Sequence, residues 1–241
     1  MPIGLPALAK MAFDGADLAP VWNALVMRLD QDPQDAAAYL DLSTIAHIQG
    51  RPDDRLVLQA LALEIGRVYR QPACAATTPP LRLLAFMAPG DFLANMPIEF
   101  MLQDANVTLD MVYLLPGHPL PQTLPDHDVA IVAVSESSRN QALLRELDGL
   151  VRSWPRPVVN APDRIARLTR DGTWALLKSA PGVTIPINAR VDRPAMARIA
   201  AGIGERWVQE WEPSLLPILE RARTADYASM TDAQLQDALD V

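Results

Sequence analysis

Residues 81–115 read LRLLAFMAPGDFLANMPIEFMLQDANVTLDMVYLL, and this stretch decides the fold. Two apolar runs of strand length stand at its ends. Between them lie a short helix and a loop that carries Gly90, Asp91 and Asn95. A strand, a helix and a second strand indicate the start of a parallel α/β layer, and such sheets bind ligands in the loops that follow their strands.

The pattern continues beyond this stretch. Further apolar runs are separated by a helical pattern at 138–154, which is typical of a parallel sheet covered on both faces. The strands are expected at Leu81–Met87, Val107–Leu115, Val129–Val134 and Arg156–Asn160. We therefore predict an α/β protein with a Rossmann-like parallel sheet flanked by helices over 81–192, an N-terminal helical hairpin, and a helical C-terminal tail over 193–241.

The N-terminal part has helical spacing of its apolar residues. We predict a helical region over 1–71, with a hairpin that turns at Gly50 and a last helix over Leu56–Tyr69, followed by a proline-ended linker over 72–80. The hairpin resembles a tetratricopeptide unit, whose packing positions are taken here by Tyr39, Leu42, Ala46 and Ala62. Arg55 departs from that pattern, since a small residue is expected there. One such unit cannot bury its own apolar face, so the resemblance implies that the helical N-terminus packs either on the α/β layer or on a protein partner.

Composition excludes several classes of protein. The formal net charge of −8 argues against binding to nucleic acid, whose phosphates require clustered Lys and Arg. No window approaches the roughly 20 apolar residues of a membrane span, so we expect no membrane contact. The single cysteine, Cys74, cannot form an internal disulfide, and no secretory signal is recognisable, which favours a cytoplasmic protein.

The segment 157–191, PVVNAPDRIARLTRDGTWALLKSAPGVTIPINARV, is similar to a passage of the ATP-grasp ligases. Asn160, Pro162, Asp171 and Pro186 carry the resemblance, which identifies 81–192 with the domain that precedes the ATP-grasp module. ATP-grasp enzymes need two further α/β subdomains, and the 50 residues after Val191 are too few for them. The resemblance therefore implies a protein that binds a small acceptor substrate or assists a catalytic chain, with no cofactor of its own.

Polar residues that follow the predicted strands are the candidate ligand-binding residues. They are expected to meet in one crevice at the carboxyl ends of the strands, and they are Asp91, Asn95, Ser135, Glu136, Ser137 and Asn160. Simple turn and cap roles are the alternative for Asp91 and Asn95. Glu99 has the ordinary role of an acid in the first helical turn. A small transferase that uses loop 88–95, and a non-enzymatic interaction module, remain alternative functions.

No metal site is predicted. His127 stands between Asp126 and Asp128, but no second ligand has suitable spacing. No catalytic residue can be assigned from the spacing of the three histidines.

Overall fold

The computed structural model describes residues 1–72 and 80–186. The chain forms two compact units, Met1–Thr173 and Trp174–Val241. The predicted tail over 193–241 and most of the predicted linker over 72–80 lie outside the described residues. In the second unit, the ammonium group of Lys178 lies 4.8 Å from the centre of the Trp174 ring.

Four helices open the first unit: α1 (Leu5–Phe13), α2 (Ala19–Gln31), α3 (Ala36–Ile48) and α4 (Pro52–Ile65). Asp35 begins α3 by accepting a hydrogen bond from the Ala38 N–H at 3.0 Å. Gly50 turns the chain into α4 with a left-handed φ of 68°, which confirms the expected turn of the hairpin. The first three helices share an apolar core that contains Leu8, Leu25, Leu42 and Ile45.

The sheet has five strands: β1 (Val68–Gln71), β2 (Leu81–Met87), β3 (Val107–Tyr113), β4 (Val129–Val132) and β5 (Val158–Val159). Their order is β1-β3-β2-β4-β5. β3, β2, β4 and β5 are parallel as expected, whereas β1 runs antiparallel to β3 along one edge. The sheet is therefore mixed, and the prediction of a purely parallel sheet was wrong in this respect.

The edge strand β1 also corrects the helical prediction for residues 56–71. Helix α4 ends at Ile65, and Gly66 takes an extended conformation. Val68 and Tyr69, whose side chains favour strands, then pair with Val112 and Met111. The apolar spacing of this segment suits a helix and a buried strand equally, so sequence periodicity could not separate the two.

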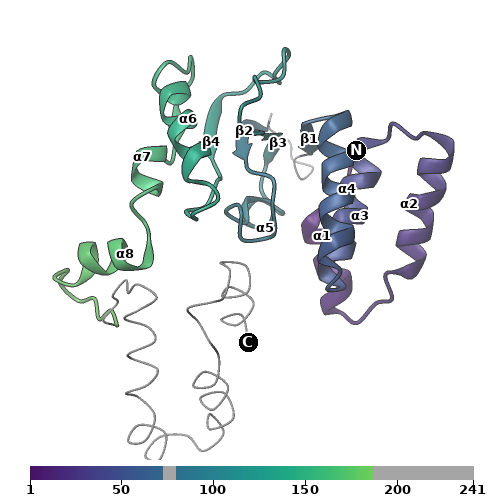
Figure 1. The fold of residues 1–241 in the computed structure, drawn as a ribbon, viewed down its shortest axis with the longest axis horizontal. Helices are drawn as coiled ribbons and strands as arrows, with labels where there is room; N and C mark the ends of the chain where they lie inside the picture. The colour runs from purple at the N-terminus through teal and green to yellow at the C-terminus, as the bar shows by residue number, and fades with distance from the viewer. Residues whose placement is uncertain (73–79, 187–241) are drawn as a thin grey trace, which may run out of the picture. The chain divides into compact units, whose positions relative to one another are not determined.

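Helices cover both faces of the sheet (Figure 1). On one face, α3, α4 and α5 (Ile98–Met101) pack on alternate residues of the strands, among them Leu83, Ala85 and Met87 of β2. On the other face, α6 (Gln141–Arg152) packs on Leu84 and Phe86. This layering confirms the α/β class.

Two short helices follow the sheet, α7 (Pro162–Ile165) and α8 (Arg170–Leu177). Among residues 1–72 and 80–186, no helix is long and apolar enough to cross a bilayer.

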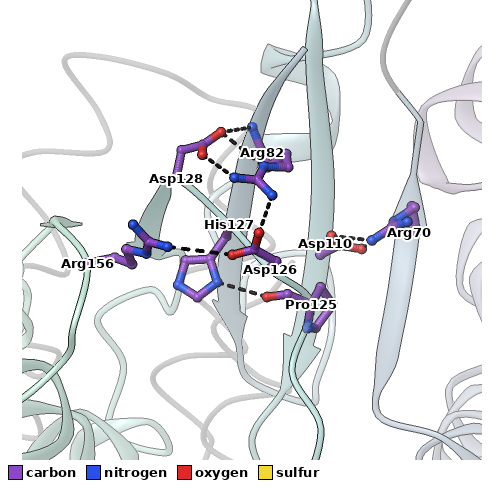
Figure 2. A network of polar contacts seen from close by, with 8 residues as sticks. All are labelled: Arg70, Arg82, Asp110, Pro125, Asp126, His127, Asp128 and Arg156. Atoms are coloured by element: carbon purple, nitrogen blue, oxygen red, sulfur yellow. Dashed lines mark hydrogen bonds and ion pairs between the residues drawn. The ribbon is translucent and has the colours of Figure 1, made fainter. Parts of the chain in front are cut away.

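Ion pairs hold the amino ends of β2 and β4 together (Figure 2). The guanidinium of Arg82 donates to Oδ1 of Asp128 at 2.5 Å and also contacts Asp126. Arg156 lies 3.7 Å from the other oxygen of Asp126. The hydrogen bonds from the side chain and backbone N–H of Arg82 lower the pKa of Asp128 to about 2. This network is exposed, so water and salt screen it.

A second ion pair, also drawn in Figure 2, joins β1 to β3. Arg70 and Asp110 lie directly opposite each other. Nε and Nη2 of Arg70 donate to Oδ1 and Oδ2 of Asp110 at 2.7 and 2.9 Å. The side chain of Asp110 is 3% exposed, whereas that of Arg70 is 55% exposed. Arg70 therefore covers a carboxylate that would otherwise be buried without a counter-charge.

Replacing Arg70 with Met is expected to lower the free energy of unfolding by roughly 2 kcal/mol, because Asp110 loses the partner that compensates its burial. Replacing Asp110 with Asn in the same chain should restore part of the loss. Urea denaturation measures both effects. R82M, which breaks the exposed network, serves as the matched control and is expected to lower the free energy of unfolding less than R70M does, because water screens these charges. An R70M loss no larger than that of R82M would contradict this role for Asp110.

Candidate functional site

The order of the parallel strands in the sheet reverses between β2 and β4, and the candidate site lies at the carboxyl ends of these two strands. β2 lies between β3 and β4, so the connection from β2 runs to one side and the connection from β3 crosses back to the other. Ligands of open α/β sheets bind at such a point. The loops that follow β2 and β4 meet here.

The loop after β2 is held in one conformation. Within the loop, the Asn95 amide accepts from the Ala88 N–H and donates to the Ala88 carbonyl, each at 2.7 Å. From α4, the Gln59 amide accepts from the Gly90 N–H at 2.9 Å and donates to the Gly90 carbonyl at 3.0 Å. Gly90 is required, since its φ is 150° and an added Cβ would lie 2.7 Å from Cβ of Ala94.

Hydrogen bonds join this loop to the loop after β4. The Met96 N–H donates to the Ala133 carbonyl at 2.6 Å, and the Ser135 N–H donates to the Ala94 carbonyl at 2.9 Å. The buried Asn140 side chain donates to the carbonyls of Ala94 and Ser135 at 3.0 and 2.9 Å. The expected crevice between β2 and β4 is thus closed by the backbone of the two loops.

An adjacent cavity of about 200 Å³ lies between the N-terminal helices and the loop after β2. α1, α3 and α4 form one wall, and loop 88–97, α5 and the ends of β2 and β3 form the other. Much of its lining is apolar, including Leu5, Ala9, Leu40, Met87, Met96, Phe100, Met111 and Tyr113.

Only two of the six predicted ligand-binding residues line this cavity, Asp91 and Asn95. Asp91 also accepts a hydrogen bond from the Leu93 N–H at 2.9 Å, which forms a turn. The structure brings together the two loops that carry most of the predicted residues, and two of the six side chains line this cavity.

The other four are not among the residues that line the cavity. The Ser137 hydroxyl accepts from the Asn140 N–H at 3.2 Å, and Glu136 accepts from the Gln141 amide at 3.1 Å. Ser135 makes its hydrogen bonds through its backbone, because its N–H donates to the Ala94 carbonyl and its carbonyl accepts from the Asn140 side chain. Asn160 has a left-handed φ of 62°, and its amide lies 3.3 Å from the Val132 carbonyl oxygen.

Arg55 and His47 form the basic end of the cavity. The Arg55 side chain projects from α4, the residue is 8% exposed, and Nη1 has no hydrogen-bond partner among the residues that the structure describes. The His47 ring lies against Phe92, with ring centres 3.9 Å apart. Burial, and then the charge of Arg55, lower the pKa of His47, while Asp91 opposes them. Arg55 therefore supplies the positive charge at this end.

Asp41 and Glu99 form the acidic end. The N–H groups of Ile3 and Gly4 donate to the two oxygens of Asp41 at 2.7 and 3.1 Å. The Leu5 N–H donates to Glu99 over 3.4 Å, which is a long and weak bond. Burial raises the pKa of Asp41. Burial and the neighbouring Asp41 raise the pKa of Glu99 to about 7, against the lowering effect of the Leu5 N–H.

The site was missed from sequence because its charged residues come from the helices as well as from the strand-end loops. Asp41, His47 and Arg55 lie on the hairpin, and Glu99 lies on α5. Arg55 did carry a signal, since the resemblance to a tetratricopeptide unit predicted a small residue at its position. Among residues 1–72 and 80–186, no group of three or more His, Cys, Asp or Glu side chains is arranged to hold a metal ion.

Comparisons with protein-family models, with curated proteins and with solved structures found no match to this chain.

Replacing Glu99 with Gln is expected to stabilise the protein above neutral pH. The folded state raises the pKa from 4.5 to about 7, so the unfolded chain ionises first as pH rises. The wild-type free energy of unfolding should fall through this interval and then level, a loss of up to roughly 3 kcal/mol. Because Gln does not ionise, the E99Q variant has no such loss. Its free energy of unfolding should therefore exceed that of the wild type above pH 4.5, and the difference should reach its full value near pH 8.

Chemical denaturation at several pH values measures this difference, and E146Q, which removes an exposed carboxylate on α6, is the matched control. An E99Q variant that is less stable than the wild type near pH 8 would contradict the buried, half-ionised state of Glu99.

Proposed function

We propose that this chain binds a small organic carboxylate in the cavity between the α3–α4 hairpin and the loop after β2. The observation that carries the proposal is Arg55, which is among the residues that line the cavity and whose buried Nη1 has no hydrogen-bond partner among the described residues. A buried charge without a counter-charge is costly, and an anion in the cavity would compensate it. The planar guanidinium also matches the two oxygens of a carboxylate.

The surroundings of Arg55 favour a singly charged anion over a phosphate. Asp91, Asp41 and Glu99 line the same cavity. They would repel a phosphate dianion more strongly than a carboxylate, because Coulomb energies scale with charge. The apolar lining suits a hydrocarbon body attached to the carboxylate.

We further propose that the ligand is the acceptor substrate of a ligase-type protein of ATP-grasp descent. Two observations support a Rossmann-like layer of that descent. They are the resemblance over 157–191 and the order of the parallel strands, in which β2 comes first in the chain and lies between β3 and β4. We also propose that the protein is cytoplasmic, because its single cysteine, Cys74, cannot form an internal disulfide.

A second candidate function is the binding of a protein partner by the tetratricopeptide-like hairpin. Leu56 and Val57 favour it, because these apolar side chains of α4 are 52% and 61% exposed. The opposite face of the hairpin is occupied, since Leu40, Ala62 and Leu63 pack on the sheet. A partner could therefore contact only the outer face of α4.

The carboxylate site is tested with butyrate and hexanoate as probes, by ligand-observed NMR and calorimetry. Wild-type protein should bind at least one of them, and R55M should weaken that binding by roughly tenfold or more, because a hydrogen-bonded charge pair is lost. R145M, which removes an exposed arginine on α6, should bind as the wild type does.

Two further probes separate this proposal from its competitors. Inorganic phosphate should bind more weakly than the carboxylates, and ATP with Mg²⁺ should show no submillimolar binding to this chain alone. Equal carboxylate binding by R55M and wild type, or strong ATP binding, would overturn the proposal.

A further inference from the structure

The two charged ends of the cavity are separated along a single helix. Asp41 and His47 both line the cavity from α3. They are six positions apart, which corresponds to about 9 Å along the helix axis. Arg55 lies close enough to His47 to lower its pKa, and Asp41 lies close enough to Glu99 to raise its pKa. The guanidinium of Arg55 is therefore at one end of the cavity, near His47 and Asp91, and the carboxylates of Asp41 and Glu99 are at the other.

The acidic end has capacity for a cationic group. Backbone N–H groups already satisfy one hydrogen bond to each oxygen of Asp41. Among the residues that the structure describes, Glu99 receives only the long bond from the Leu5 N–H. An ammonium group carries three donors and a positive charge. Placed beside Glu99, it would offset both the burial of this carboxylate and its repulsion by Asp41.

The lining between the two ends is apolar. Leu40, Met87 and Met111 contribute to it, and thioether side chains adapt to the shape of a hydrocarbon chain. A ligand that satisfies both ends must therefore carry its charges at opposite ends of an aliphatic chain. An α-amino acid carries both charges on one carbon and could satisfy only one end.

We infer that the ligand of this cavity is an ω-amino carboxylate, whose carboxylate pairs with Arg55 and whose ammonium group pairs with Glu99 beside Asp41. This inference rests on the proposed carboxylate site and adds the second charged group and its distance from the first. Glu99 then selects the ligand, and Arg55 anchors it.

The test compares isomers and matched carboxylates on the full chain by calorimetry. The probes are 6-aminohexanoate, its isomer 2-aminohexanoate and plain hexanoate, together with 4-aminobutyrate and butyrate as a shorter pair. For at least one chain length, the ω-amino carboxylate should bind roughly tenfold or more tightly than its plain carboxylate. It should also bind more tightly than the α-amino isomer.

Variants assign the effect to the acidic end. E99Q should lose the preference for the amino group while it still binds hexanoate, and this binding shows that the variant is folded. E146Q, an exposed control on α6, should keep the preference.

Each outcome separates this inference from the proposed function. If plain carboxylates bind through Arg55 as tightly as the ω-amino compounds, the inference fails and the carboxylate site stands. If 2-aminohexanoate binds most tightly, the separation of charges is wrong. If an ω-amino preference survives in E99Q, Glu99 does not select the ligand. If no probe binds, the inference and the proposed function fail together.

Discussion

The packing of the α3–α4 hairpin on one face of the sheet is the contact on which the rest of the first unit depends. Leu40, Ala62 and Leu63 fill the space above alternate residues of the strands. The same contact brings helical side chains next to the loop after β2, where Gln59 holds Gly90 by two hydrogen bonds. The fold thus creates a cavity with charged residues from elements far apart in sequence.

Apolar runs of strand length predicted the α/β class and the parallel strands, because a strand covered on both faces has no polar side to alternate. The edge strand β1 was beyond this reasoning. Val68 and Tyr69 continue the apolar pattern of α4, and the extended Gly66 and the pairing with β3 separate the strand from the helix. The mixed character of the sheet is a tertiary effect that local sequence does not contain.

The candidate site was predicted in part. The rule that ligands bind after strands led to the loop that carries Asp91 and Asn95, and both residues line the cavity. The rule could not reveal Arg55 or Glu99, because their roles depend on how the hairpin and α5 pack around the strand ends. A charged residue at a small-residue position of a helical hairpin is the signal that sequence did contain.

The most direct test of the account is the stability of unliganded protein when Arg55 is replaced with Met. If the buried guanidinium has a counter-charge only when a ligand is bound, it destabilises the unliganded protein, and its removal should raise the free energy of unfolding. Urea denaturation at neutral pH should then show R55M to be more stable than the wild type, by about 1 kcal/mol or more. A comparable loss of stability would show that Arg55 is compensated within the protein, and would contradict the account.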